Sequence, residues 1–136
     1  MRIYYRYMKK DFDNWNNKKI RVHQEESRVF FHEREVWWCR IGLNIGYEQD
    51  GKGGNFSRPV IIFKKFNNEV CWIIPLSTKI KRGKFYIQVD LKDKIQRVAV
   101  ISQLRLIDAK RLYQKINMLS KYDYKNIQSA VIDLCQ

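Results

Sequence analysis

Three side chains near the middle of the chain carry groups that can act together on a phosphodiester. They are the carboxylate of Glu48, the guanidinium of Arg58 and the hydroxyl of Ser77. A planar guanidinium can bind two phosphate oxygens at once, so it stabilises charge that develops in a transition state better than a lysine does. A hydroxyl can position the phosphate, and a carboxylate can accept a proton. These residue types are therefore compatible with phosphate chemistry.

Each of these residues also has an ordinary structural role open to it. Arg58 could form a surface salt bridge, and Ser77 could close a turn by binding a nearby backbone N–H. Thr78 could supply the hydroxyl in place of Ser77. The residue types alone leave these alternatives open.

The other common catalytic groups are sparse. His23 and His32 both precede the apolar strand patterns, so a nuclease with paired histidines is disfavoured. Cys39, Cys71 and Cys135 are far apart, without the close pairs of a zinc site. Cys39 and Cys71 lie in apolar strand patterns, where cysteine usually acts as a small hydrophobe. We expect no metal site, no cofactor and a reducing cytoplasmic location.

A predicted β-hairpin brings the candidate residues together. Residues 60–66 and 69–76 are rich in β-branched and aromatic side chains, and two asparagines between them tolerate the positive φ of a tight primed turn. Antiparallel pairing across that turn places Arg58 and Ser77 at the same end of the sheet. Pro75 cannot donate to a strand ladder, so the second strand is expected to leave the sheet there.

Further strand patterns predict the rest of a sheet. Residues 36–41 form a strong strand in which Trp37 and Trp38 point to opposite faces, one into the core and one toward the surface or an interface. Residues 84–91 alternate, and residues 98–107 continue the pattern. We expect a mainly β fold with C-terminal helices (α+β), built on a small, strongly curled, SH3-like antiparallel β-barrel.

Two helices are expected to close the chain. Asp108 can cap the first, and Ser120 with Asp123 forms a capping-box pattern for the second. The apolar residues at helical spacing are Leu112, Ile116 and Leu119 in the first, and Tyr124, Ile127, Val131 and Leu134 in the second.

The charge balance points to a polyanionic partner. The 136 residues include 27 Lys and Arg against 14 Asp and Glu, a net charge of +13. Such an excess attracts polyanions because each neutralised phosphate releases counterions, although solubility alone is an alternative. No stretch approaches the ~20 apolar residues of a membrane span, so no membrane association is expected.

Four motifs resemble, in the same order, those of the PemK/MazF toxins of bacterial toxin–antitoxin pairs. They are a glycine-x-Glu-Gln loop, an Arg-Pro strand start, a Pro-x-Thr-Thr corner and a Gln-x-Arg-x-Ile-Asp segment. Here they read Gly46-Tyr47-Glu48-Gln49, Arg58-Pro59, Pro75-Leu76-Ser77-Thr78 and Gln103-Leu104-Arg105-Leu106-Ile107-Asp108. The resemblance runs from about Glu35 to the C-terminus.

The resemblance implies a metal-independent endoribonuclease that cuts single-stranded RNA at short sequences. Attack by the 2′-OH would leave a 2′,3′-cyclic phosphate and a 5′-OH. It also implies a homodimer and an acidic antitoxin, with DNA bound by the toxin–antitoxin complex. Arg58, Ser77 and Glu48 are the implied catalytic residues. Those implied to bind RNA or to support the site are Tyr47, Gln49, Thr78, Lys79, Lys81, Gln103 and Arg105.

The chain departs from the family pattern in several places. Ser77 stands where the family usually has threonine, and Tyr47 and Ser102 replace a histidine and an aspartate of other members. The general acid and base are therefore left open. Residues 50–57 lengthen the loop before Arg58, which suggests a lid or specificity loop.

Two other functions remain open at this point. One is an RNA-binding barrel without catalysis, and the other is a toxin of the same superfamily that poisons a topoisomerase. The expected domain from residue 31 to residue 136 is preceded by a basic extension, residues 1–30. We expect this extension to be partly helical, around residues 11–20, or disordered. It is either a passive arm or a basic flap that helps to hold RNA or the partner.

Overall fold

The computed structural model describes residues 9–136; residues 1–8 of the expected N-terminal extension lie outside the described residues. Helix α2 (Phe12–Gln24) comes first in this range, and helix α3 (Lys121–Leu134) comes last. The strands are β1 (Glu35–Cys39), β2 (Arg58–Lys65), β3 (Val70–Ser77), β4 (Tyr86–Val89), β5 (Arg97–Val100), β6 (Arg105–Asp108) and β7 (Leu112–Met118). Two 3₁₀ turns, η1 (Ile101–Gln103) and η2 (Ala109–Arg111), flank β6.

The strands of residues 9–136 form one seven-stranded antiparallel sheet with the order β4-β5-β3-β2-β1-β7, to which β6 adds on β3. This confirms a mainly β fold with helices. The sheet ends at β4 and β7 and is not closed, so the strongly curled SH3-like barrel is not confirmed. The physical reason lies in β3. This strand pairs with β6 along Val70–Ile73 and with β5 only at Leu76 and Ser77, so the β4–β5 pair extends from its end.

The β2–β3 hairpin is confirmed, but its turn differs from the prediction. Phe66 N donates to Val70 O, and neither Asn67 nor Asn68 has a positive φ. Instead the Asn67 side chain accepts hydrogen bonds from the backbone N–H of Glu69 and Val70, each at 2.9 Å. Asparagine closes the turn through its side chain rather than through a left-handed backbone.

The prediction that β3 leaves the sheet at Pro75 is wrong. Pro75 stands opposite Val60 on β2, and the strand continues to Ser77. The β2 ladder ends there, and Leu76 pairs with Ala99 of β5 on the other edge of the strand. Pro75 therefore marks a change of partner, at a position where its missing N–H does not end the strand.

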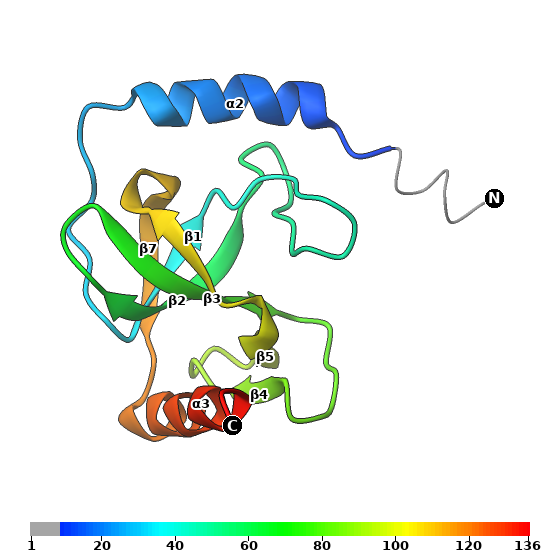
Figure 1. The fold of residues 1–136 in the computed structure, drawn as a ribbon, viewed down its shortest axis with the longest axis vertical. Coiled ribbons are helices and arrows are strands. Elements are labelled where there is room, and N and C mark those ends of the chain that lie inside the picture. Colours follow the sequence, from blue (N-terminus) through cyan, green and yellow to red (C-terminus); the bar gives the residue numbers. More distant parts are fainter. Residues whose placement is uncertain (1–8) are drawn as a thin grey trace.

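Both faces of the sheet carry a buried core. Trp37, Cys39, Val60, Ile62 and Ile73 are on one face. The other face buries Val36, Ile61, Ile74 and Leu76 against Leu119 and Ile127, the last of which belongs to α3. Figure 1 shows α3 and α2 at opposite ends of the molecule. Burial on both faces explains why β2 and β3 read as nearly continuous apolar runs.

The two neighbouring tryptophans separate as predicted. Trp37 is 7% exposed and lies in the core, whereas Trp38 is only partly buried and lines a surface pocket. Alternation along β1 explains the difference.

The prediction of a first C-terminal helix, after Asp108, is wrong. Asp108 does cap a turn, since its side chain accepts a hydrogen bond from Lys110 N at 2.8 Å, but that turn is the short η2. Leu112–Met118 then forms β7 along β1, with Gln114 opposite Trp38. A helix there would leave the backbone N–H and C=O groups along that edge of β1 without partners. Strand pairing with β1 therefore overrides the helical spacing of the apolar residues.

The second predicted helix is confirmed as α3. Ser120 Oγ accepts a hydrogen bond from Asp123 N at 3.0 Å, which is the expected cap. None of the described helices is long and apolar enough to cross a membrane.

The helix predicted around residues 11–20 is also present, as α2, and it packs on the sheet domain. Asp11 caps it by accepting a hydrogen bond from Asn14 N, and Trp15 and Val22 are buried. The Trp15 ring stacks at a tilt on Phe56, with ring centroids 5.6 Å apart. An ion pair holds the segment after α2 against β6. Arg28 Nε donates to Asp108 Oδ1 at 2.9 Å, and Arg28 Nη2 donates to Asp108 Oδ2 at 2.8 Å.

The Arg28–Asp108 pair predicts how stability depends on pH. Hydrogen bonding to Arg28 lowers the pKa of Asp108, so the pair stabilises the fold above the unfolded-state pKa and is lost as pH falls through the lowered value. Arg28→Met should lower the urea midpoint at pH 7, and the difference from wild type should shrink below about pH 4. Urea unfolding followed by circular dichroism between pH 7 and 3 measures this.

A charge-matched control is Lys125→Met on the exposed face of α3. It removes one positive charge far from Asp108. Its small effect on the urea midpoint should therefore stay the same between pH 7 and pH 3. A difference between Arg28→Met and wild type that stays constant down to pH 3 would contradict the prediction.

Candidate functional site

Arg58 and Ser77 line one surface pocket of about 580 Å³ at the open end of the β2–β3 hairpin. Thr78 lines the same pocket, Lys52 adds positive charge, and Arg97 lines it as a guanidinium paired with Asp93. The apolar lining comes from Trp38, Pro59, Leu76, Ile95, Tyr113 and Ile116. The pocket thus combines cationic side chains with aromatic and aliphatic ones, a lining that suits a phosphate attached to a flat base.

The Arg58 guanidinium is held at several points. Its Nε donates to Asp50 O at 2.7 Å and its Nη1 to Leu76 O at 3.1 Å. With the Gln49 amide turned so that its oxygen faces Arg58, Nη2 donates to that oxygen at 2.8 Å. Since a guanidinium has five N–H donors, others remain for an anion. Burial lowers the pKa of Arg58, partly opposed by the Asp50 carboxylate, but arginine keeps its charge at neutral pH.

Ser77 has the turn role that its residue type also allowed. Its Oγ accepts a hydrogen bond from Lys79 N at 3.1 Å. A hydroxyl that accepts one hydrogen bond can still donate its own, so Ser77 can contact a phosphate oxygen in the pocket. Lys79 and Lys81 follow on the exposed β3–β4 segment and do not line the pocket.

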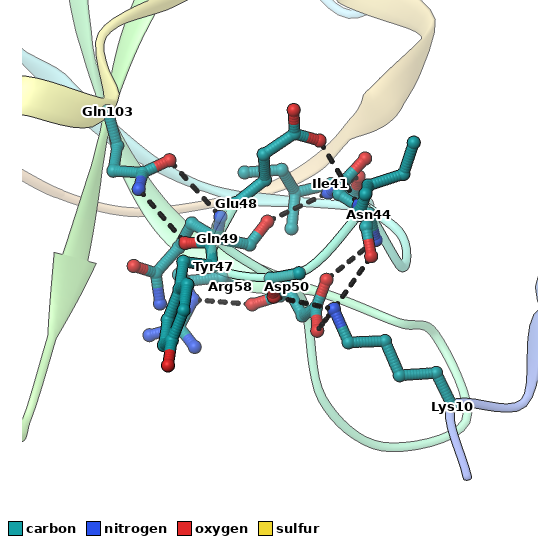
Figure 2. A network of polar contacts seen from close by, with 11 residues as sticks. Lys10, Ile41, Asn44, Tyr47, Glu48, Gln49, Asp50, Arg58 and Gln103 are labelled. Atoms are coloured by element: carbon teal, nitrogen blue, oxygen red, sulfur yellow. Dashed lines mark hydrogen bonds and ion pairs between the residues drawn. The ribbon is translucent and has the colours of Figure 1, made fainter. Parts of the chain in front are cut away.

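Glu48 does not join Arg58 and Ser77 in this pocket. It lines a second pocket, of about 310 Å³, with Gln49, Gln103 and Arg105. Its Oε1 accepts a hydrogen bond from Ile45 N at 3.1 Å, and Figure 2 shows its side chain extending away from Arg58. The expected convergence of three groups on one patch is therefore met by Arg58 and Ser77 and not by Glu48.

Gln49 lines the second pocket and reaches Arg58 of the first, and Gln103 holds the backbone beside it. Gln103 Oε1 accepts a hydrogen bond from Gln49 N at 3.1 Å, and its Nε2 donates to Tyr47 O at 3.2 Å (Figure 2). Gln103 thus holds the backbone of the corner formed by residues 44–50, which is the supporting role predicted for it. The Tyr47 ring is 85% exposed at the tip of this corner.

The structure adds pocket residues that sequence reasoning did not select. Arg97 is 8% exposed, and its Nη1 contacts both carboxylate oxygens of Asp93 at 2.9 and 2.7 Å. A charged residue at the start of an apolar strand was the available signal. Tyr113 donates to Ser57 Oγ at 2.9 Å, and the sequence pattern, which predicts a helix over residues 112–119, gives no signal for this contact.

The two buried cysteines, Cys39 and Cys71, line neither of these pockets. Burial raises the pKa of both Cys39 and Cys71 to about 12, so both remain thiols at neutral pH. Within residues 9–136, no three His, Cys, Asp or Glu side chains gather in a way that could hold a metal ion.

Comparisons with known proteins place the chain in a family. Residues 32–135 match the family model described as PemK-like, MazF-like toxin of type II toxin–antitoxin systems. No curated protein sequence matches the chain.

Solved structures share the fold at low sequence identity. MazF from Deinococcus radiodurans is 13% identical, covers 79% of this chain and 97% of its own, and superposes with a TM-score of 0.64. Mycobacterium tuberculosis toxin MazF-mt6 is 14% identical, covers 74% and 94%, and gives 0.58. A mycobacterial endoribonuclease in complex with its cognate antitoxin is 12% identical, covers 78% and 95%, and gives 0.60. Because the family model spans most of the sequence, this chain belongs to the PemK-like, MazF-like toxins of type II toxin–antitoxin systems.

Proposed function

We propose that this protein is a metal-independent endoribonuclease toxin that cleaves single-stranded RNA at short sequences. The observation that carries the proposal is the anchored Arg58 guanidinium, which shares a pocket with Ser77 and Thr78. The 2′ oxygen attacks the neighbouring phosphorus and loses its proton to a base, while the leaving 5′ oxygen gains one. The products are a 2′,3′-cyclic phosphate and a 5′-OH. Arg58 stabilises the negative charge of the phosphorane, and Ser77 positions the phosphate.

The RNA strand in this proposal runs from the first pocket to the second. In this proposal Glu48 leaves Ile45 N and turns toward the 2′-OH when RNA binds, and Gln49, which reaches Arg58 from the second pocket, contacts the nucleotide beside the cut. The exposed Tyr47 ring offers a face for base stacking. The further RNA contacts are to Thr78 in the pocket, to Gln103 and Arg105 beside Glu48, and to Lys79 and Lys81 along the β3–β4 segment.

The place of Glu48 favours one other candidate, an RNA-binding protein without catalysis. A carboxylate that lies outside the Arg58 pocket and contacts a backbone N–H is not set up as a base in this conformation. In that case Arg58 and the lysines would only bind phosphate.

Cleavage of a fluorescent single-stranded RNA in excess chelator separates these candidates. An endoribonuclease of the proposed type should cleave it under single-turnover conditions, and 5′-end sequencing should return 5′-OH ends next to a recurring short sequence. Binding without cleavage would leave the RNA-binding candidate, and cleavage that chelator abolishes would contradict the metal-independent mechanism.

We further propose a homodimer that is inhibited by an acidic antitoxin. The apolar walls of the Arg58 pocket continue across β1, β2 and β7 at Trp38, Pro59 and Ile116, a surface suited to a second copy. Structures described as MazE–MazF from Deinococcus radiodurans are among the similar folds. The net charge of +13 suits an acidic partner. Light scattering at tens of micromolar should report a dimer, and a monomer would contradict this proposal.

A further inference from the structure

Lys10, just before α2, reaches across to the corner that holds Arg58. Its ammonium contacts Asn44 O at 2.7 Å, Gly46 O at 3.0 Å and Asp50 Oδ2 at 2.9 Å. Three partners match the three N–H donors of an ammonium, and the Lys10 side chain is only 14% exposed. These contacts join positions 34 or more residues apart in the sequence, so this lysine fixes tertiary structure.

Asp50 stands between the Lys10 ammonium and the Arg58 guanidinium. One carboxylate oxygen of Asp50 contacts Lys10, and the other accepts a hydrogen bond from Asn44 N at 2.6 Å. The main-chain oxygen of Asp50 accepts the bond from Arg58 Nε (Figure 2). Any shift of the Asp50 backbone therefore moves an acceptor that sets the plane of Arg58.

Polar contacts rather than burial hold this corner, residues 44–50. The side chains of Ile45 and Tyr47 at its tip are 79% and 85% exposed. Asn44 Nδ2 donates to Gln49 O at 2.8 Å, which closes the corner on itself. With few apolar anchors at its tip, the corner depends on its ionic and hydrogen-bonding contacts for a single conformation.

The docking of α2 fixes the position of Lys10. Phe12 N donates to Lys10 O at 2.9 Å as the helix begins, and buried Trp15 follows about one turn later. The Trp15 ring lies against Gly42, where even a Cβ atom would overlap it. The packed helix α2 thus fixes the backbone at Lys10. Only the Lys10 side chain then has to be ordered for its ammonium to reach the corner.

We propose that Lys10 is a positioning residue for Arg58, acting through Asp50 and the 44–50 corner. This inference rests on the proposed nuclease function for its catalytic consequence. Without the ammonium, the Asp50 carboxylate loses its cation and two corner carbonyls lose a donor. The corner then samples other conformations, and Arg58 meets the phosphate in its productive geometry less often. Turnover falls, while RNA is still bound by the remaining basic surface.

The test compares Lys10→Met, which keeps the side-chain length, with Lys125→Met on α3, which removes the same charge at the other end of the molecule. Lys10→Met should lower the single-turnover cleavage rate by about 10- to 100-fold, the size expected for a misplaced catalytic group. Its affinity for an RNA with a 2′-deoxy nucleotide at the cut should match that of Lys125→Met. Equal cleavage rates for the two variants would overturn the proposal.

A double variant tests the route through Asp50. Asp50→Asn keeps the main-chain oxygen that Arg58 uses but removes the charge that Lys10 meets. If Lys10 acts through that carboxylate, Lys10→Met with Asp50→Asn should cleave no more slowly than the slower single variant. Rate losses that multiply would mean that Lys10 acts by another route, which overturns this part of the inference.

Hydrogen exchange separates this inference from the proposed function because it needs no cleavage. Lys10→Met should speed amide exchange at Asn44, Ile45 and Gln49, which are bonded within or beside the corner, and leave the core of β3 unchanged. Unchanged exchange would show that Lys10 does not hold the corner. If the wild-type protein cleaves no RNA, the proposed function and the catalytic consequence both fail, and the exchange result still decides whether Lys10 orders the corner.

Discussion

Arg58→Ala is expected to lower single-turnover RNA cleavage by roughly 10²–10³-fold, the usual cost of removing one donor to a transition-state charge. The guanidinium is anchored by Asp50 O and Leu76 O, so it is oriented before the substrate arrives. Such a group stabilises the phosphorane more than the ground state. The affinity for an RNA that cannot be cleaved should therefore fall far less than the rate.

Arg58→Lys is the matched variant because it keeps the charge and loses the planar fork. A lysine cannot donate to Asp50 O and Leu76 O and also bind two phosphate oxygens, so this variant should remain strongly impaired. Recovery of most of the rate by lysine would mean that charge alone matters at this position. Cleavage by Arg58→Ala at the wild-type rate would place the active site elsewhere.

Ser77 gives a smaller effect for comparison in the same pocket. Ser77→Ala removes one neutral hydrogen bond, worth about 0.5–1.5 kcal/mol, and should slow cleavage by only about 2- to 13-fold. Ser77→Thr keeps the hydroxyl and restricts its rotamers, so it should retain or raise the rate. The order of the rates, with Arg58→Ala far below Ser77→Ala, is the expected signature of a stabilising cation beside a positioning hydroxyl.

Much of this site could be predicted because it depends on local sequence. The apolar runs on either side of Asn67 and Asn68 are sufficient for a hairpin, and a hairpin brings Arg58 and Ser77 to one end. Likewise, Ser120 and Asp123 sit three residues apart before an apolar stripe, and such a cap forms whatever surrounds it.

The mistaken elements are those that other parts of the chain decide. Leu112, Ile116 and Leu119 fit a helix, but β1 needed a partner for its free edge and the segment became β7. Glu48 lies in the motif predicted from the sequence, yet the corner turns its side chain to Ile45 N and into a separate pocket. Lys10 and Asp50 meet only because α2 docks, and no pattern of spacing marks a contact of that kind.

The docking of α2 leads to the second large prediction, on stability. Gly42 has φ of +82° and lies beneath the Trp15 ring, so an alanine there would be strained and would overlap the indole. A left-handed backbone costs a non-glycine residue about 1–2 kcal/mol, and overpacking typically costs a further 1–3 kcal/mol. Gly42→Ala should therefore lower the free energy of unfolding by about 2–5 kcal/mol in urea titrations.

Gly54→Ala is the matched control in the following loop. Its added Cβ would meet nothing within 4 Å, and its φ does not lie in the left-handed region, so its effect should stay within about 0.5 kcal/mol.

Adding Trp15→Ala to Gly42→Ala should cost less than the two single losses together, because the smaller side chain removes the overlap. Since Trp15 seats the helix that delivers Lys10, Gly42→Ala should also slow RNA cleavage at temperatures where the protein is still folded. If Gly42→Ala and Gly54→Ala unfold at the same urea concentration, Trp15 does not pack on Gly42. The docking of α2 would then not explain how Lys10 is positioned to act on Arg58.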